Sequence, residues 1–367
     1  MLLGVLKENK EAETRVALHP EGVASVEKLG LKVGVETGAG ELSYSKDELY
    51  QNQGAEIYTD RKKLLNEADV IIHIHPPDEE IIRYLKEGCI WISFISPHES
   101  PETVRLFEKQ GVTVFAMESL PRISRAQSMD ALSSMASLGG YKSVLMAATS
   151  LGKYMPMMMT AAGTIPPSKV LVLGAGVAGL QAIATARRLG AVVEAFDVRA
   201  AVKEQVESLG ATFVETETES DAETKGGYAR EQDETTQTKQ RELLAKHAAK
   251  SDIVITTALI PGKKAPVLIT GEMVTNMKAG SIIMDLAAGQ GGNCELSKPD
   301  QTVIKNGVTI FGPTNLPATM PIHASRLYGK NMIELLTHLM KDGEFTLDFE
   351  DEITRKTVLT HQGKPVE

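Results

Sequence analysis

Short apolar runs alternate with helical patterns along the first 120 residues. Runs rich in Val, Ile and Leu predict strands at residues 2–6, 32–36, 55–58, 70–74, 90–95 and 112–116. Stretches with helical spacing lie between them, notably at residues 20–29, 46–52 and 101–110. Strands that alternate with helices predict a parallel sheet with helices on both faces.

A second βα series follows a longer helical pattern at about residues 129–151. Its strands are predicted at residues 169–174, 192–197, 211–214, 253–257, 281–286 and 308–311, and a last helical pattern covers residues 322–340. We therefore expect an α/β fold of two Rossmann-like, doubly wound parallel-sheet domains with a cleft between them. Residues 1–138 with 322–367 would form the first domain, and residues 139–321 the second.

Length and composition support this organisation. A chain of 367 residues exceeds the size at which single cores stop growing, and 42% hydrophobic residues are enough for two cores. The net charge of −9 argues against nucleic acid as the main partner. Because Cys89 and Cys294 lie far apart, and no signal peptide or 18-residue apolar run is found, we expect a soluble cytosolic protein without membrane insertion.

A glycine fingerprint opens the second series. A predicted buried strand runs into Gly174, Gly176 and Gly179 in the spacing G-x-G-x-x-G, and a predicted helix follows. The first glycine would permit a tight turn, the second would let a pyrophosphate approach the backbone, and the third would let helix and strand pack closely. The N–H groups near Val177 and Ala178 would face the phosphates. The alternative is a glycine turn that only packs.

An acidic residue completes the fingerprint. Asp197 lies 18 residues after Gly179, at the end of the next predicted strand. Its carboxylate could accept both hydroxyls of a ribose and would repel a 2′-phosphate, which favours NAD over NADP. Arg199 complicates this preference, because a nearby arginine can accommodate NADP.

Polar side chains concentrate between residues 122 and 134, in the segment RISRAQSMDALSS. In dinucleotide enzymes, the nicotinamide end lies near the crossing between domains. The structural alternative is a capped helix start, with Ser or Asp as the N-cap. No metal-spaced Cys/His cluster is present; His73 and His75 would share one face of a strand, and no third ligand lies nearby. We therefore expect no metal site.

The acidic segment at residues 215–236 interrupts the βα rhythm. It contains a Gly-Gly pair and almost no apolar residue. A loop of this length inside a compact domain is either functional or a solvated surface loop.

These segments together resemble the NAD(H)-binding component of proton-translocating NAD(P) transhydrogenases. The resemblance rests on the polar segment at 122–134, the segment PMMMTAAGT at 156–164, the glycine fingerprint and GGYA at 226–229. The opening segment, with Arg15 and Pro20, is similar to the wider alanine dehydrogenase and transhydrogenase superfamily. The similarity runs over nearly the whole chain. The chain resembles the separate alpha subunit of transhydrogenases that are split over several polypeptides.

The resemblance implies roles for individual residues. Gln127 would bond the nicotinamide ribose, while Arg122 and Asp130 would hold the loop and the carboxamide. Tyr228 would be the tip of a mobile loop that closes over the nucleotide, which makes the acidic segment functional. Further nucleotide contacts are implied at Ile123, Ser124, Arg125, Ser133, Val198, Gly227 and Leu259.

Departures from alanine dehydrogenases favour the transhydrogenase reaction. The resemblance implies that those enzymes need a lysine, a histidine and an aspartate, where this chain has His75, Ser96 and Gly289. Without an acid–base pair, the site is poorly equipped to oxidise an amine. A stand-alone alanine-type dehydrogenase remains the alternative function, and a non-catalytic NADH sensor is a second one.

The resemblance also implies partners and a reaction. Hydride would pass directly from NADH on this chain to NADP⁺ on a partner subunit. A membrane-spanning subunit would translocate protons, and the chain itself would be a homodimer in the cytoplasm, peripheral to the inner membrane.

Overall fold

The structure is a computed structural model that describes residues 1–215, 234–260, 262–341 and 343–366. The chain divides into two compact units: Met1–Met135 with Pro317–Glu367, and Ala136–Leu316. The sequence placed these boundaries at residues 138 and 322. Helix α6 (Ala131–Ser150) contains the first boundary. Among the described residues, no helix is long and apolar enough to cross a lipid bilayer.

The first unit is built on an eight-stranded sheet in the order β19-β18-β6-β5-β4-β1-β2-β3. Its strands are β1 (Leu2–Val5), β2 (Lys32–Glu36), β3 (Glu56–Tyr58), β4 (Val70–Ile72), β5 (Ile90–Ser93), β6 (Thr113–Ala116), β18 (Val358–His361) and β19 (Lys364–Pro365). Strands β1 to β6 pair in parallel, as the alternating pattern predicted. Strands β18 and β19 extend the sheet beyond β6 in antiparallel pairing, which the apolar pattern did not predict.

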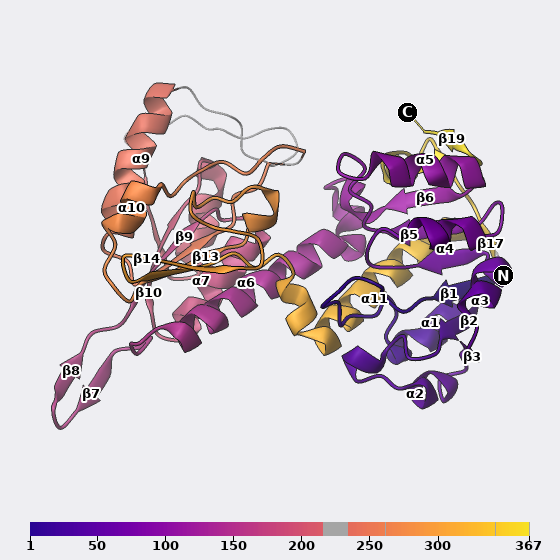
Figure 1. Cartoon of the computed structure of the whole chain (residues 1–367), viewed down its shortest axis with the longest axis horizontal. Coiled ribbons are helices and arrows are strands. Elements are labelled where there is room, and N and C mark those ends of the chain that lie inside the picture. Colours follow the sequence, from indigo (N-terminus) through magenta and orange to yellow (C-terminus); the bar gives the residue numbers. More distant parts are fainter. Residues whose placement is uncertain (216–233, 261, 342, 367) are drawn as a thin grey trace. The chain divides into compact units, whose positions relative to one another are not determined.

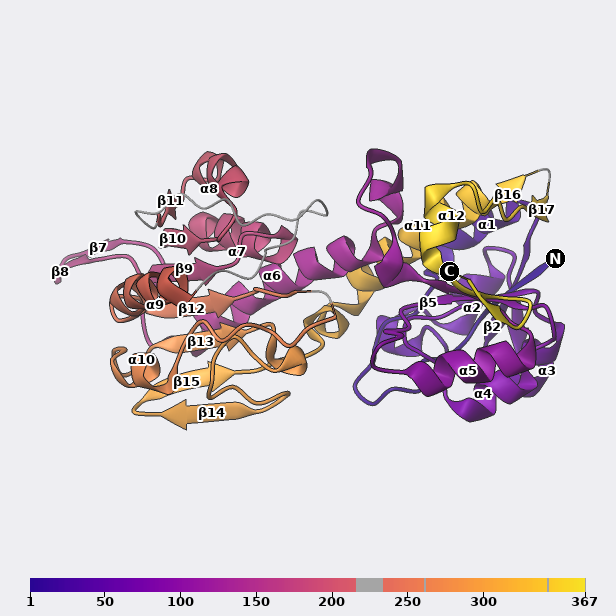
Figure 2. The ribbon, with the colours of Figure 1, turned by 90° about the horizontal axis from the view of Figure 1, so that it is seen from above.

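Helices cover both faces of this sheet. The α-helices of the unit are α1 (Val23–Glu27), α2 (Asp47–Gln51), α3 (Arg61–Glu67), α4 (Glu79–Tyr84), α5 (Pro101–Gln110), α11 (Pro321–Leu339) and α12 (Glu352–Thr357). Figure 2 shows α3, α4 and α5 on one side of the strands and α1, α11 and α12 on the other. Trp91 is fully buried in the core on the α3–α5 face, where its ring lies 5.7 Å from that of Phe107.

Short elements complete the first unit. They are the 3₁₀ helices η1 (Pro20–Gly22), η2 (Glu41–Ser43), η3 (Met117–Ser119) and η4 (Ser124–Met129), and the antiparallel pair β16 (Met340–Lys341) and β17 (Glu344–Phe345). The 3₁₀ helix η7 (Leu316–Thr319) precedes α11.

The second unit is built on a seven-stranded sheet in the order β11-β10-β9-β12-β13-β15-β14. Its strands are β9 (Lys169–Leu173), β10 (Val192–Phe196), β11 (Thr212–Phe213), β12 (Ile253–Thr256), β13 (Ile282–Asp285), β14 (Thr302–Lys305) and β15 (Val308–Phe311). The strand order reverses between β9 and β12, which makes their carboxyl ends the switch point where α/β sheets bind ligands.

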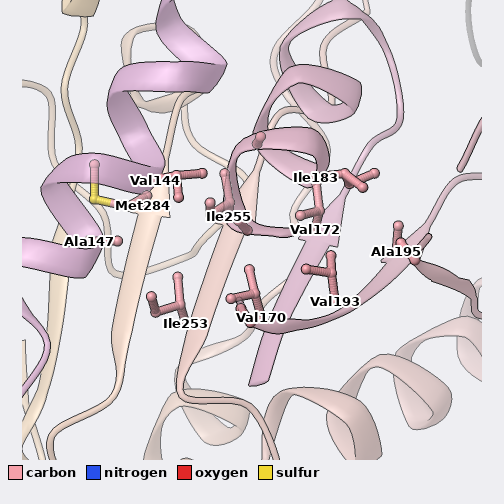
Figure 3. Packing of buried hydrophobic residues seen from close by; sticks show 14 of the residues in the cluster. Val144, Ala147, Val170, Val172, Ile183, Val193, Ala195, Ile253, Ile255 and Met284 are labelled. Carbon is pink, nitrogen blue, oxygen red and sulfur yellow. The ribbon is translucent and has the colours of Figure 1, made fainter. Parts of the chain in front are cut away.

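Alternating side chains of these strands enter two separate cores. One core joins the sheet to α6, α7 (Val177–Arg188) and α8 (Lys203–Ser208), and Figure 3 shows Val144 and Ala147 of α6 close to this face. The other core joins it to α9 (Glu234–Ala248) and α10 (Gly271–Thr275). The 3₁₀ helices η5 (Ala200–Val202) and η6 (Ala288–Gln290) follow β10 and β13. The fold is therefore the doubly wound α/β fold that the sequence predicted, with helices on both faces.

Two antiparallel features of the second unit were not anticipated. Strand β14 pairs with β15 through Asn306 and Gly307, both with positive φ, which is a favoured two-residue hairpin turn. Strands β7 (Met158–Thr160) and β8 (Gly163–Ile165) form an exposed two-stranded ribbon, which extends away from the rest of this unit (Figure 1).

Candidate functional site

The turn after β9 has the geometry expected of a dinucleotide fingerprint. Gly174 has φ of +97°, and a Cβ at this position would lie 2.7 Å from Oγ1 of Thr257. Its N–H donates to the carbonyl of Phe196 over 2.8 Å. The backbone conformation and the close neighbour both require glycine here.

The other two glycines differ in what surrounds them. A Cβ on Gly179 would lie 1.8 Å from the carbonyl oxygen of Gly174, so α7 packs too closely on the turn for any side chain. A Cβ on Gly176 would meet nothing within 4 Å. Space beside the backbone of Gly176 is therefore open, as the approach of a pyrophosphate requires.

Helix α7 presents its first N–H groups next to this open space. Gly176 is its N-cap and supplies no side-chain hydrogen bond, and Val177 is 43% exposed. The first N–H groups of a helix lack partners within the helix, and the helix dipole adds partial positive charge. The residues present thus fit a bound pyrophosphate, with the N–H groups of Val177 and Ala178 as candidate donors.

Asp197 lies directly after β10 at the same edge of the sheet. Its Oδ2 accepts from the backbone N–H of Ala175 over 2.7 Å, which ties the glycine turn to the neighbouring strand. The guanidinium of Arg199 binds both carboxylate oxygens. Val198, between them, is half-buried against the α9–α10 core.

The end of β12 supplies residues that the sequence analysis missed. Thr257 donates its hydroxyl to the carbonyl of Gly174 over 2.9 Å, and so supports the turn from the next strand. Asn293 accepts from the N–H of Ala258 and donates to the carbonyls of Ala258 and Pro266, each over 2.8–2.9 Å. These bonds hold the segment in which Leu259 is 39% exposed.

A buried carboxylate organises the loop that carries Asn293. Asp285 ends β13, is fully buried, and accepts five hydrogen bonds. The donors are the hydroxyls of Thr256 and Ser297 and the N–H groups of Ala287, Asn293 and Cys294. The spacing of residues along the chain does not reveal this network, because Thr256 belongs to the neighbouring strand β12 and the other donors are spread over the segment after β13.

Helix α6 contacts the start of α7 through a glycine. A Cβ on Gly140 would lie 2.1 Å from the carbonyl oxygen of Ala178. The two helices therefore approach at their backbones, next to the candidate phosphate donors. The pair Gly139-Gly140 inside a predicted helix is the sequence signal for this close approach.

In the first unit, the polar segment at 122–134 forms η4 and the start of α6. Asp130 caps α6, because its Oδ1 accepts from the N–H of Ser133 over 2.8 Å and its Oδ2 accepts from the Ser133 hydroxyl over 2.6 Å. The capped helix start, which is the structural alternative for this segment, is therefore present. This cap accounts for Asp130 and Ser133, but it does not explain the remaining polar side chains of the segment.

Helices α11 and α12 hold η4 in place. Arg125 forms an ion pair with Asp351, the N-cap of α12. The hydroxyl of Ser128 donates to Glu334 over 3.1 Å, and Asn331 donates to the Ser128 carbonyl over 2.7 Å. Of the predicted nucleotide contacts, Arg122, Ser124 and Gln127 are exposed, and Ile123 is half-buried. The segment is thus a fixed platform that carries exposed polar side chains.

A second polar cluster lies at the carboxyl edge of the first sheet, near β1 and β4. Glu13 is buried, accepts from Nε and Nη2 of Arg15 over 2.7 and 2.6 Å, and lies 2.6 Å from Nε2 of His75. Burial by itself would raise the pKa of Glu13, but the hydrogen bonds from Arg15 and His75 and the charge of Arg15 outweigh it and lower that pKa well below its usual range.

The expectation that His73 and His75 share a strand face is wrong. Strand β4 ends at Ile72, so both residues lie in the loop beyond it. Nδ1 of His73 donates to the His75 carbonyl over 2.7 Å, and its ring packs on Trp91. Its Nε2 lies 3.3 Å from Glu8 without the geometry of a hydrogen bond. The described residues contain no group of three potential metal ligands.

Gly227 and Tyr228, which the resemblance places in a loop over the nucleotide, lie outside the described residues. Their roles stay predictions.

Comparison with known proteins decides the family. The alanine dehydrogenase/PNT N-terminal domain matches residues 4–139, and the alanine dehydrogenase/PNT C-terminal domain matches residues 143–367. The chain belongs to the alanine dehydrogenase/PNT family. The resemblance inferred from the sequence is thereby confirmed.

Within this family, the similarity is stronger to transhydrogenases than to alanine dehydrogenases. The chain is 48% identical to the first part of NAD(P) transhydrogenase subunit alpha of Rhodospirillum rubrum, over 99% of this chain and 97% of that protein. Its fold matches a transhydrogenase from Sinorhizobium meliloti with a TM-score of 0.91 and 44% identity over the full length of both chains. Identity to the alanine dehydrogenase of Bacillus subtilis is 31%, over 88% of this chain and 81% of that protein.

The three positions at which the resemblance implies departures from alanine dehydrogenases lie in defined places. His75 is bound to Glu13 in the polar cluster of the first sheet. Ser96 follows β5 with φ of +52°, and its N–H donates to Glu118. Gly289 lies in η6, after β13.

Proposed function

We propose that this chain is the NAD(H)-binding alpha subunit of an NAD(P) transhydrogenase. The observation that carries the proposal is full-length similarity to transhydrogenase alpha subunits, combined with an open glycine turn at the start of α7. NADH is a substrate of this reaction and supplies the hydride. The protein has to bind NADH, orient its nicotinamide and keep water away.

The second unit would bind the adenosine diphosphate half of NADH. The N–H groups of Val177 and Ala178 would bind the pyrophosphate, and open space at Gly176 admits it. Asp197 would accept from the ribose hydroxyls and would repel a 2′-phosphate, which supports NAD over NADP. Val198 and Leu259 would line the adenosine side.

The polar segment of the first unit would orient the nicotinamide. The exposed amide of Gln127 would bond the nicotinamide ribose, and Arg122 would hold the carboxamide. Both oxygens of Asp130 accept from Ser133, which holds the carboxylate at the start of α6, so we assign it the positioning of the segment. Tyr228 and Gly227 would close over the nucleotide.

Hydride would then pass from NADH to NADP⁺ on a partner subunit. No side chain has to accept a proton in this step. Its rate depends on placement, because the reacting carbons must approach to roughly 3–3.5 Å in a fixed orientation. Proton translocation would belong to a membrane-spanning partner, which would hold this chain at the cytoplasmic face of the inner membrane. We also propose that the chain is a homodimer, which sedimentation of the purified protein can test.

Isotope transfer tests the function directly. The purified chain is mixed with the NADP(H)-binding subunit of a transhydrogenase, NADP⁺ and NADH deuterated at C4 of the nicotinamide. Deuterium should appear in NADPH without exchange into water. The same chain with NAD and alanine should form no NADH. Alanine oxidation without deuterium transfer would replace the proposal by the dehydrogenase alternative, and NADH binding without either reaction would favour a sensor.

A conservative substitution tests the role of Gln127. Gln127→Asn shortens the side chain and should slow hydride transfer far more than it weakens NADH binding, because it moves the ring without removing the phosphate contacts. Gln51→Asn, at an exposed position of α2, is the matched control and should change neither quantity. Equal losses of rate and affinity in Gln127→Asn would argue against the orienting role.

A further inference from the structure

Four donors hold the carboxylate of Asp197 within the second unit. The side chain is 5% exposed, and each of its oxygens accepts two hydrogen bonds. Oδ1 accepts from the backbone N–H and from Nε of Arg199, both over 2.9 Å. Oδ2 accepts from Nη2 of Arg199 and from the backbone N–H of Ala175, both over 2.7 Å.

These donors are two backbone groups and the two prongs of one guanidinium. A carboxylate offers about four lone-pair sites, so the donors fill all of them. The backbone N–H groups of Ala175 and Arg199 are fixed by the glycine turn and by the end of β10. The guanidinium ends a side chain with several rotatable bonds and is therefore the exchangeable partner. It takes one site on each oxygen, which is the pattern that two adjacent ribose hydroxyls would take.

We propose that the guanidinium of Arg199 is an internal competitor for the nucleotide ribose, and that it leaves Asp197 when NADH binds. The inference rests on the proposed function and adds a residue that sets the affinity of its binding site. In the nucleotide-free protein, Arg199 keeps a nearly buried carboxylate paired with an opposite charge. In the bound protein, the two vacated sites accept the hydroxyls.

The competition lowers the apparent affinity for NADH. When a ligand binds only those protein molecules whose site is free, its apparent affinity equals its intrinsic affinity multiplied by the fraction of free molecules. If Arg199 occupies Asp197 in about nine molecules out of ten, the apparent affinity falls about tenfold. Arginine suits this role better than lysine, because only the guanidinium presents a two-pronged fork.

Equilibrium titration of three variants with NADH tests the competition. Arg199→Ala should bind NADH about tenfold more tightly than the unaltered chain, since the fraction of open sites approaches one. Arg199→Lys keeps the charge without the two-pronged guanidinium, so its affinity for NADH should lie between those of Arg199→Ala and the unaltered chain. Arg188→Ala removes the same charge from an exposed position on α7 and should leave the affinity unchanged.

A dinucleotide that lacks the 2′-hydroxyl of its adenosine ribose is the second probe. Its gain from Arg199→Ala should be smaller than that of NADH, because a single hydroxyl displaces only one prong and the guanidinium can keep its bond to the other oxygen of Asp197. Thermal unfolding confirms that each variant is folded, and Arg199→Lys carries the test if the alanine variant is unfolded.

Two results would overturn the competition. One is NADH binding by Arg199→Ala that is equal to or weaker than that of the unaltered chain. The other is an equal gain in affinity from Arg199→Ala for NADH and for the dinucleotide that lacks the 2′-hydroxyl. If Arg199→Ala binds NADPH more weakly than the unaltered chain and binds NADH equally well, Arg199 is assigned to a 2′-phosphate instead. A chain that binds no NADH in any form would remove the proposed function, and this inference with it.

Discussion

Replacing Gly140 by alanine should disturb the nucleotide site through the packing of two helices. The new Cβ would lie 2.1 Å from the carbonyl oxygen of Ala178, in the first turn of α7. Ordinary contact therefore requires the two helices to separate by more than about 1 Å. A backbone carbonyl cannot rotate away as a side chain does, so the start of α7 has to move.

The neighbouring glycine provides a matched control. A Cβ on Gly139 would lie 3.7 Å from Leu286, which is an ordinary contact. Both substitutions gain about 1 kcal/mol of helix propensity in α6. Their difference in unfolding free energy therefore isolates the cost of overpacking, which is about 1–3 kcal/mol. We expect Gly139→Ala to be as stable as the unaltered chain or more so, and Gly140→Ala to be less stable than Gly139→Ala by that difference.

Binding should change in the same direction. Displaced N–H groups at Val177 and Ala178 would bind the pyrophosphate less well, and each kcal/mol lost there weakens NADH binding about fivefold. Urea unfolding and NADH fluorescence titration measure the two quantities. The reasoning fails if the two alanine variants agree within about 0.5 kcal/mol and bind NADH equally.

Three further predictions concern Thr257, Glu13 and the two cysteines. Thr257→Val removes the hydroxyl that donates to the carbonyl of Gly174, so it should lower the free energy of unfolding by about 1–2 kcal/mol and weaken NADH binding severalfold. Thr257→Ser keeps the hydroxyl and should retain both stability and NADH affinity. Equal behaviour of the two variants in urea and NADH titrations would contradict this role. Glu13→Gln leaves a buried arginine without its counter-charge and should cost about 3 kcal/mol at pH 7. Because the pKa of Glu13 is lowered in the folded protein, its contribution to stability is fully present above the ordinary value of 4.5 and is lost progressively as pH falls from there toward the folded pKa. The gap between the urea midpoints of Glu13→Gln and the unaltered chain should therefore begin to narrow only below the ordinary value of 4.5. Burial raises the pKa of Cys89 to about 12 and of Cys294 to about 11, so neither thiol should react with a disulfide reagent at pH 8 until the chain is denatured, and rapid labelling of the folded protein would contradict the burial.

Much of the fold was predictable because its signals are local. Buried parallel strands read as continuous apolar runs, and each run in the two βα series corresponds to a strand within one or two residues. The missed hairpin at Asn306-Gly307 also had a local signal, since this dipeptide favours a tight turn with positive φ at both positions. The antiparallel β18 had none, because its pairing with β6 joins segments that are far apart in the chain.

The error at His73 and His75 shows how strand ends limit such reasoning. The apolar pattern continues to Ile74, but the hydrogen-bonded strand stops at Ile72. Beyond that point the two-residue alternation no longer decides direction, and contacts to Glu13 and Trp91 orient the two rings separately.

The sequence by itself determined the doubly wound fold, the glycine turn and the acid that follows the next strand. Each of these depends on backbone conformation or on spacing along one short segment. Only the tertiary structure decided that Arg199 occupies both oxygens of Asp197, that Thr257 supports the turn, and that Gly140 touches α7. Such contacts depend on the positions of groups in space to a few tenths of an ångström, and hydrophobic periodicity carries no information at that scale.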